Sequence, residues 1–344
     1  MNINLTCSTD DKYLQHCAAM LCSVFDNNRT HEITVHLLHH NLSEKSIAFL
    51  TQLGKQYGNN ILFYDVDEKK LENVSIAKNH PNLSIATYYR LFLPSLLDNS
   101  INRILYLDCD VIVLKDISNL FKLNLEEYGV AAVRDSTPWS DVHREVMGKA
   151  LNSHSFCAGV LLINLKYWRE HKCQDKMLQY ADKMQGKLIM EDQDILNYVF
   201  HEKWFELPYK YGKASMGIAI LDENQKWNDI KEYAFDPSIM HYATHVKPWL
   251  DIRIPDDRYY WKYVKLSGYP NPRKTKTLKQ YRKSIYYAKI RYYINYFIRP
   301  FIPNTLEILF KDIINILKMF LYLYNINKFK EFRLKIWIEK YKKL

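Results

Sequence analysis

Residues that break regular structure are scarce in this chain. Its 344 residues include only 9 Gly and 11 Pro, and we find no internal repeat and no low-complexity segment. With 48% hydrophobic and 25% charged residues, the chain has enough apolar surface to bury a core, which excludes disorder as its main state. Its length suits one large domain with an appendage, or two domains.

Cysteine is also sparse, and its pattern is not that of a zinc-binding module. The sequence has no Cys-x-x-Cys pair and no zinc-finger spacing. Most cysteines lie in apolar runs, which predicts buried free thiols in a reducing compartment. The amino-terminal residues lack a basic region followed by a long apolar one, so we expect no signal peptide and a cytoplasmic location. The six cysteines are Cys7, Cys17, Cys22, Cys109, Cys157 and Cys173.

No apolar stretch reaches the roughly 18 residues that a membrane-spanning helix needs. The carboxyl-terminal part nevertheless differs from the rest, because residues 271–344 hold 18 Lys and Arg against 4 Asp and Glu. The preceding residues hold 30 basic and 34 acidic side chains, so all the excess positive charge lies in the tail. We therefore divide the chain into a main domain, residues 1–265, and a basic, aromatic helical tail, residues 266–344.

From Thr305 to Asn325 the tail has one polar stripe on an otherwise apolar helix pattern. Combined with many Lys, Arg and aromatic residues, this pattern predicts an amphipathic helix on an anionic membrane surface, here the inner face of the cytoplasmic membrane. The alternative is that the helix packs on the main domain or on a second copy. We do not expect nucleic acid as a partner, because binding a phosphate backbone does not require so many Ile, Leu and Phe residues.

The main domain begins with alternating strand and helix patterns joined by short connections. Such alternation predicts βαβ units and an α/β fold with a mostly parallel central sheet flanked by helices. We expect Arg90 to be exposed on the helix that precedes the fourth strand. The expected strands are residues 2–7, 33–38, 61–64, 104–107, 130–133 and 160–163. The expected helices are residues 13–25, 43–57, 86–93, 175–184 and one beginning near residue 190.

Two acids follow a buried strand, at Asp108 and Asp110. Unpaired charge is costly where water is scarce, and a divalent cation is one way to neutralise it. Carboxylate oxygens suit Mn²⁺ or Mg²⁺, and such sites leave room for substrate phosphates. The alternative is a strand that ends in a solvated acidic turn. Residues 8–11 also follow a strand, so one crevice at the carboxyl edge of the sheet is expected to hold both segments.

Six motifs in order, from about residue 3 to about residue 250, resemble glycosyltransferase family 8. These are retaining nucleotide-sugar enzymes with a Rossmann-like GT-A fold. Within the family, the chain resembles bacterial lipooligosaccharide galactosyltransferases and their glucosyl relatives. The motifs are Ser8-Thr-Asp-Asp-Lys-Tyr13, Thr87-Tyr-Tyr-Arg-Leu91, Leu105-Tyr-Leu-Asp-Cys-Asp110, Cys157-Ala-Gly-Val-Leu-Leu-Ile-Asn-Leu165, Glu191-Asp-Gln-Asp-Ile-Leu196 and His241-Tyr-Ala-Thr-His-Val-Lys-Pro-Trp249.

The resemblance implies roles at the phosphate and base end of a UDP-sugar donor. Asp108 and Asp110 would bind the metal with His241 as third ligand, and Lys247 would approach the diphosphate as a point charge. The segment that begins at Ser8 would bind the base. Two of its residues match positions that hold uracil in the family. Asp10 would form a hydrogen bond with the base, and Tyr13 would stack on it.

The resemblance also implies the sugar end of the site. Arg90 and Asp192 match residues that hold sugar hydroxyls, and Gln193 matches the residue beneath the anomeric carbon. Cys157 and Ala158 lie in the motif that touches the sugar. Retention in this family is explained by attack on the face that the diphosphate leaves, with the leaving phosphate as base. No carboxylate nucleophile is then required, unlike in glycoside hydrolases.

Two positions depart from the family pattern. Cys157 stands where the family commonly has Asn, and a thiol is a much weaker hydrogen-bond partner for a sugar. Thr244 replaces the Gly of a His-x-x-Gly-x-x-Lys motif, where Gly allows close approach of the backbone to phosphate. These departures bear on sugar choice and on the geometry of the diphosphate.

Two other functions compete with this interpretation. A buried strand followed by Asp-x-Asp also resembles phosphatases of the haloacid dehalogenase type, in which Asp108 would be the nucleophile. Those chains place that strand close to the amino terminus, unlike this one. The second alternative is a nucleotide-sugar or carbohydrate-binding protein of the same fold without turnover. The acceptor, a glycan or glycolipid, and the choice between galactose and glucose are not specified by the sequence.

Overall fold

The computed structural model describes most of the main domain and little of the tail. Described residues are 1–71, 84–135, 148, 154–184, 186–214, 236–243, 246–251, 254, 256–277, 282 and 286. A first compact unit comprises Met1–Thr277, and a second comprises Leu278–Leu344. The sequence division at residue 265 therefore falls within the first unit. Among the described residues, no helix is long and apolar enough to cross a membrane.

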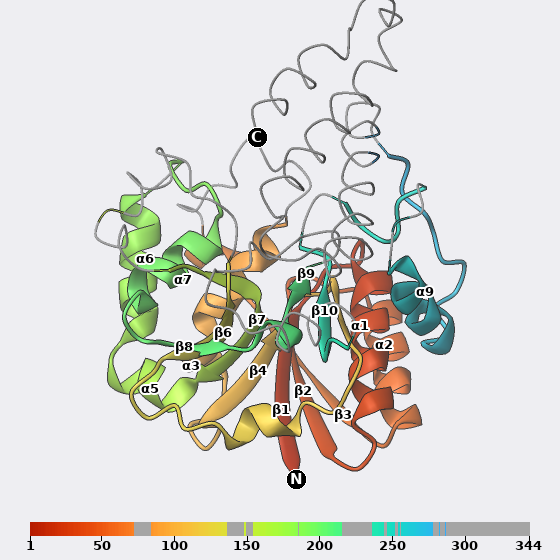
Figure 1. The fold of residues 1–344 in the computed structure, drawn as a ribbon, viewed down its shortest axis with the longest axis horizontal. Helices are drawn as coiled ribbons and strands as arrows, with labels where there is room; N and C mark the ends of the chain where they lie inside the picture. The colour runs from red at the N-terminus through yellow and green to blue at the C-terminus, as the bar shows by residue number, and fades with distance from the viewer. Residues whose placement is uncertain are drawn as a thin grey trace, which may run out of the picture. The chain divides into compact units, whose positions relative to one another are not determined.

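A seven-stranded mixed sheet forms the centre of the first unit (Figure 1). Six strands run in one direction, and only β7 runs antiparallel to its neighbours β4 and β6. The expected mostly parallel sheet is therefore confirmed. The strand order is β3 (Asn60–Asp65), β2 (Glu32–His39), β1 (Asn2–Ser8), β4 (Arg103–Leu107), β7 (Phe156–Asn164), β6 (Val130–Arg134) and β8 (Trp204–Leu207).

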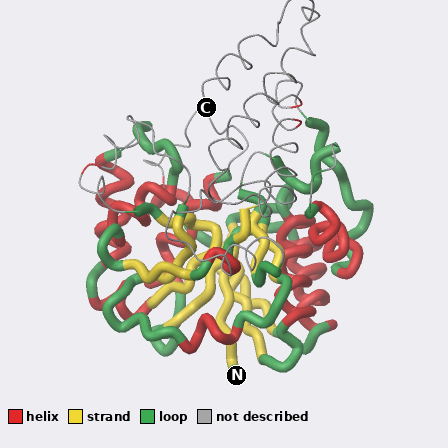
Figure 2. Tube along the Cα trace, viewed as in Figure 1, coloured by secondary structure: helices red, strands yellow, loops and turns green. Residues whose placement is uncertain are grey.

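Helices flank this sheet in two groups (Figure 2). Helices α1 and α2 accompany the β1–β3 half, and helices α5, α6 and α7 accompany the half that contains β6–β8 (Figure 1). The inner parallel strands β1, β2, β4 and β6 are mostly buried, which agrees with their largely apolar sequences, whereas the edge strands β3 and β8 are partly exposed. The helices are α1 (Leu14–Asn27), α2 (Glu44–Gln56), α3 (Leu93–Leu96), α5 (Leu165–Glu170), α6 (Cys173–Lys183), α7 (Asp192–Phe200) and α9 (Asp257–Leu266).

Local sequence explains where the first helices begin. The hydroxyl of Ser43 accepts a hydrogen bond from the Ser46 amide and caps α2. No side chain caps α1 in this way, but the Asp10 carboxylate accepts a hydrogen bond of 2.9 Å from the Tyr13 amide just before it. Helix α1 is buried over nearly its whole length because it packs against β5 (Val111–Val113), α2 and α9.

A second, three-stranded sheet brings a distant segment to the end of β4. Its order is β5, β10 (Ile239–His241) and β9 (Lys213–Ala214), with β10 antiparallel to β5 and parallel to β9. The Tyr242 amide donates a 2.9 Å hydrogen bond to the Asp110 carbonyl and extends this pairing. The small sheet therefore places the end of β10 beside the acidic turn.

The expected strands and most of the expected helices are confirmed, with one difference in type. Residues Ile85–Phe92 form a 3₁₀ helix, here labelled η2, which leads into the short α3. Pro94 lies in the first turn of α3, where its missing amide donor costs no hydrogen bond. The proposed amphipathic segment of the tail, residues 305–325, lies outside the described residues.

Candidate active site

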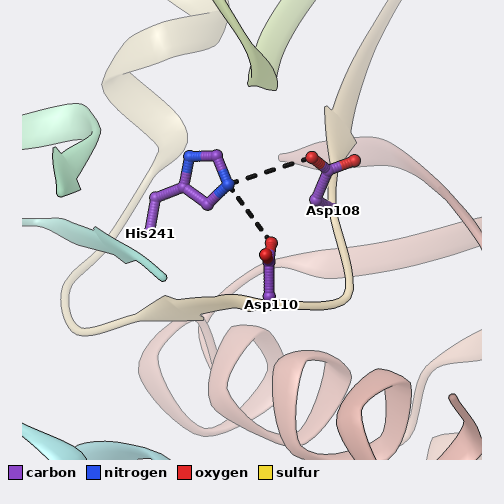
Figure 3. A group of neighbouring side chains, drawn as sticks. All are labelled: Asp108, Asp110 and His241. Atoms are coloured by element: carbon purple, nitrogen blue, oxygen red, sulfur yellow. Dashed lines mark ion pairs between the residues drawn. The ribbon is translucent and has the colours of Figure 1, made fainter. Parts of the chain in front are cut away.

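Three predicted metal ligands meet at the junction of the two sheets (Figure 3). Asp108 and Asp110 occupy the turn between β4 and β5, and the antiparallel pairing of β10 with β5 brings in His241. His241 Nε2 lies 3.2 Å from Asp110 Oδ1 and 3.8 Å from Asp108 Oδ2. One ligand atom from each residue lies within 4.8 Å of the others, a spacing that suits a single cation.

The donor set fits a hard divalent cation. Asp110 Oδ1 is buried and accepts no well-formed hydrogen bond from the described part of the chain. Its other oxygen, Oδ2, lies 2.5 Å from Lys247 Nζ. Burial opposes ionisation, but the charges of Lys247 and His241 hold the pKa of Asp110 well below its usual range. An ionised carboxylate whose buried oxygen Oδ1 faces the imidazole of His241 without a well-formed hydrogen bond is an arrangement that a metal ion would complete.

Gly159 leaves the space in which these ligands face one another. A Cβ atom at this position would lie 2.1 Å from His241 Cε1, 2.5 Å from His241 Nε2 and 2.8 Å from Asp108 Oδ2. All three separations are below 3.0 Å, a distance that non-bonded Cβ atoms in proteins essentially never reach. Only glycine therefore permits β7 to pass this close to the ligands. Gly159 lies in the motif from Cys157 to Leu165, but no role for it was predicted from the sequence.

Arg90 is buried, contrary to the exposure predicted from the helix pattern. Its side chain is 2% exposed, because it is surrounded by acceptors. It lies 2.8 Å from Asp108 Oδ1 and 3.0 Å from Asp192 Oδ2, and donates to the carbonyls of Thr87 and Ala158. A guanidinium has five N–H donors, and this pocket satisfies most of them. Arg90 thus contacts both Asp108, a predicted metal ligand, and Asp192 of the predicted sugar subsite.

Asp192 and Gln193 lie at the start of α7, and Gln193 contacts the beginning of β7. Burial raises the pKa of Asp192 to about 6, although Arg90 and the hydroxyl of Thr87 oppose the rise. Gln193 Oε1 accepts a 3.0 Å hydrogen bond from the Ala158 amide. Its amide nitrogen donates to Asp135 Oδ2 at 2.8 Å. The two contacts fix which end of the Gln193 amide faces β7.

Asp135 is a candidate site residue that was not predicted from the sequence. It directly follows β6, whose end lies at the same edge of the sheet as the end of β4. Ligands bind beyond the carboxyl ends of parallel strands, and this rule had identified Asp108. The same rule could have identified Asp135, because this carboxylate follows a predicted strand.

Cys157 lies beside His241, the predicted metal ligand on β10. Its Sγ atom is 3.6 Å from Nδ1 of His241, the ring nitrogen that faces away from the aspartates. Burial alone would lower the pKa of His241, but Asp110 and Cys157 raise it well above its ordinary value. All six cysteines are free thiols, as predicted, and five are buried whereas Cys157 is only half-buried.

The predicted base-binding residues lie next to the predicted metal ligands, with Ser8 at the end of β1. The Cys109 thiol donates to the Ser8 carbonyl at 3.1 Å, which confirms that the segments after β1 and β4 share one edge. The Ser8 hydroxyl oxygen is buried without a hydrogen-bond partner among the described residues. The rings of Tyr13 and Trp249 pack edge to face, with their centroids 6.2 Å apart. An unsatisfied hydroxyl and an aromatic ring are suited to binding a base.

An aromatic cluster supports this end of the site. His16 stacks on Trp249 with ring centroids 3.7 Å apart, and its Nδ1 lies 2.7 Å from the Tyr260 hydroxyl. Burial lowers the pKa of His16 to about 3, so the ring is neutral. Tyr260 of helix α9 and His16 therefore both contact Trp249, which lies two residues after Lys247. Thr244 lies outside the described residues, and its effect on the diphosphate stays a prediction.

The profile of Glycosyl transferase family 8 matches residues 4–253. The chain belongs to this family, which removes the haloacid dehalogenase alternative.

Known proteins resemble the chain over most of its length. It is 28% identical to General stress protein A of Bacillus subtilis over 78% of this chain and 96% of that protein. It is 27% identical to Lipopolysaccharide 1,2-glucosyltransferase of Escherichia coli K12 over 82% of this chain and 83% of that protein. The chain spans only 33% of Glycosyltransferase GlyA and 61% of Glycosyltransferase GlyF of Streptococcus pneumoniae.

A solved structure supports the fold assignment. Galactosyltransferase LgtC in complex with donor and acceptor sugar analogues superimposes with a TM-score of 0.66. The alignment covers 82% of this chain and 99% of that one, at 24% sequence identity. This likeness establishes a GT-A fold for the described body.

Proposed function

We propose that this glycosyltransferase moves a hexose, galactose or glucose, from a UDP-sugar to a glycan acceptor with retention of configuration. The observation that carries this proposal is the convergence of Asp108, Asp110 and His241, with Lys247 beside Asp110. These groups fit a diphosphate held by one cation and one lysine. Family membership supports the reaction type.

The diphosphate end of the donor would be bound by charge. A divalent cation, Mn²⁺ or Mg²⁺, supplies Lewis-acid neutralisation of the diphosphate when bound to Asp108, Asp110 and His241. Lys247 Nζ, 2.5 Å from Asp110 Oδ2, is close enough to contact a phosphate oxygen next to the same carboxylate. Ser8, Asp10 and Tyr13 would bind the uracil.

The sugar end of the donor would lie against α7 and β7. Asp192 accepts hydrogen bonds from sugar hydroxyls, and Arg90 keeps that carboxylate in place at 3.0 Å. Gln193, held by Ala158 and Asp135, lies beneath the anomeric carbon. Its fixed amide dipole stabilises the positive charge that develops there without forming a bond to it.

Transfer would proceed on one face of the sugar. The bond from the anomeric carbon to the diphosphate oxygen breaks, and the acceptor oxygen bonds to that carbon from the same side. The acceptor proton passes to the leaving phosphate, so UDP departs and no carboxylate nucleophile is needed. Cys157, in place of a stronger hydrogen-bonding side chain, is the residue that we expect to affect the choice between galactose and glucose.

The acceptor that we propose is a glycan or glycolipid of lipopolysaccharide or other surface polysaccharide. The name of the Escherichia coli relative, Lipopolysaccharide 1,2-glucosyltransferase, supports this class. The charge of the tail supports attachment of the enzyme to the inner face of the cytoplasmic membrane, because 18 of 22 charged side chains after residue 270 are basic. Lipid-linked acceptors are available on such a surface.

A donor panel tests the proposal. Purified full-length protein is incubated with Mn²⁺ and, in turn, UDP-galactose, UDP-glucose, UDP-N-acetylglucosamine and GDP-mannose, and release of the nucleoside diphosphate is measured without acceptor. We expect hydrolysis of UDP-galactose or UDP-glucose and little of the others. Tight UDP binding with no hydrolysis of any donor, and no transfer to added lipopolysaccharide, would instead favour a binding protein without turnover.

A further inference from the structure

The two oxygens of the Asp108 carboxylate lie in different surroundings. Oδ1 accepts a 2.9 Å hydrogen bond from the Tyr106 hydroxyl and a 2.8 Å hydrogen bond from an Arg90 N–H group. Oδ2 receives neither of these bonds, and instead lies 3.8 Å from His241 Nε2 and next to the open space at Gly159. The carboxylate is therefore oriented by contacts on one side only.

The strand geometry explains why Tyr106 can do this. Side chains two residues apart along an extended backbone point to the same face, so Tyr106 and Asp108 lie on one side of β4 and the segment that continues it. Tyr106 is 2% exposed, and the guanidinium of Arg90 lies 3.8 Å from the centre of its ring. The phenol is thus held in place by burial and by a cation–π contact.

We propose that Tyr106 is a positioning residue for the metal site. Its hydroxyl, together with Arg90, holds Asp108 Oδ1 and turns Oδ2 toward His241 and the cation. Without the hydroxyl, Oδ1 keeps one donor, and the carboxylate can rotate about its terminal torsion, which has a broad energy profile. This inference rests on the proposed function, because it takes Asp108 as a metal ligand.

Tyr106→Phe isolates the hydroxyl, since the ring that packs against Arg90 is retained. Tyr88→Phe is a matched control. Tyr88 is 0% exposed in the same core cluster, and its hydroxyl has no hydrogen-bond partner among the described residues. Both changes remove one buried hydroxyl oxygen, but only one of those atoms touches a metal ligand.

Binding of Mn²⁺ to the full-length chain is measured by electron paramagnetic resonance without donor, after thermal melting in chelator has shown each variant folded. We expect Tyr106→Phe to weaken Mn²⁺ binding about 10-fold or more, the usual effect of removing a group that supports a metal ligand. Tyr88→Phe should bind as wild type does. The Mn²⁺ concentration for half-maximal donor hydrolysis should rise by the same factor, while the rate at saturating Mn²⁺ recovers.

The possible results separate this inference from the proposed function. Wild-type affinity in Tyr106→Phe, or equal weakening in both variants, would overturn the role of Tyr106 and leave the metal site standing. Loss of the saturated rate without a change in Mn²⁺ affinity would also overturn it. Failure of the wild-type chain to bind Mn²⁺ would overturn the metal assignment itself, and this inference with it.

Discussion

Replacing Gly159 with alanine should close the space between the metal ligands. The added Cβ would lie 2.1 Å from His241 Cε1, whereas ordinary contact begins at 3.4 Å, so one of the two must move by about 1.3 Å. The imidazole cannot retreat freely, because it is 5% exposed and Cys157 lies 3.6 Å behind it. Gly159 belongs to the central strand β7, which is paired on both sides.

A displacement of this size should remove His241 from the coordination shell. Distances from a metal to its ligands vary by only about 0.2 Å in well-formed sites, several times less than the required movement. Loss of support for a metal ligand lowers affinity about 10- to 100-fold, so Gly159→Ala should weaken Mn²⁺ binding by at least about 10-fold. The measurement is titration of the full-length chain with Mn²⁺, followed by electron paramagnetic resonance.

Gly129→Ala provides the control for general strain. Its Cβ would lie 2.3 Å from Phe200 Cε1, a collision of similar severity in a core region away from the ligands. This variant should lower the free energy of unfolding and leave Mn²⁺ affinity unchanged. Wild-type Mn²⁺ affinity in folded Gly159→Ala, or an equal loss in Gly129→Ala, would refute the reasoning that Gly159 keeps the metal site open.

Two further changes test the sugar subsite and the tail. Asp192→Asn should weaken UDP-sugar binding by about 1–3 kcal/mol, because sugar hydroxyls lose their acceptor, while UDP affinity measured by calorimetry stays nearly constant; equal losses would place Asp192 outside the sugar subsite. Removing residues 278–344, which follow the first compact unit, should release the protein from anionic liposomes in flotation assays and preserve Mn²⁺-dependent donor hydrolysis. Loss of hydrolysis in the folded truncated protein would show that the tail belongs to the active site.

The order of elements was predictable because apolar runs and turn signals are local. An apolar run also located the Asp-x-Asp turn, since residues 104–107 of β4 are buried and Asp108 follows directly. Residues 8–11 and 108–110 were predicted to share an edge because both follow parallel strands, and the pairing of β1 with β4 confirms it. His241 was different. Its position beside Asp110 was predicted only from the family resemblance. The pairing of β10 with β5 joins segments far apart in the sequence, and no local sequence pattern indicates it.

Arg90 shows what periodicity does not reveal. A charged residue on a helix pattern is expected to face solvent, because isolated charge is costly to bury. Its burial depends on Asp108 and Asp192, which come from separate elements, so the compensating partners were not visible in the local sequence. Gly159 was missed for a similar reason, since the need for a missing Cβ arises only when β7 and β10 are brought together.

The central claim is that donor cleavage depends on a cation held by Asp108, Asp110 and His241. The most direct measurement is UDP release from the preferred UDP-hexose by the full-length chain, with Mn²⁺, with excess chelator, and with Asp110→Asn in place of the wild type. Hydrolysis that requires Mn²⁺, stops with chelator and is abolished in folded Asp110→Asn is the predicted result. Hydrolysis at the same rate in chelator, or in Asp110→Asn, would contradict the account.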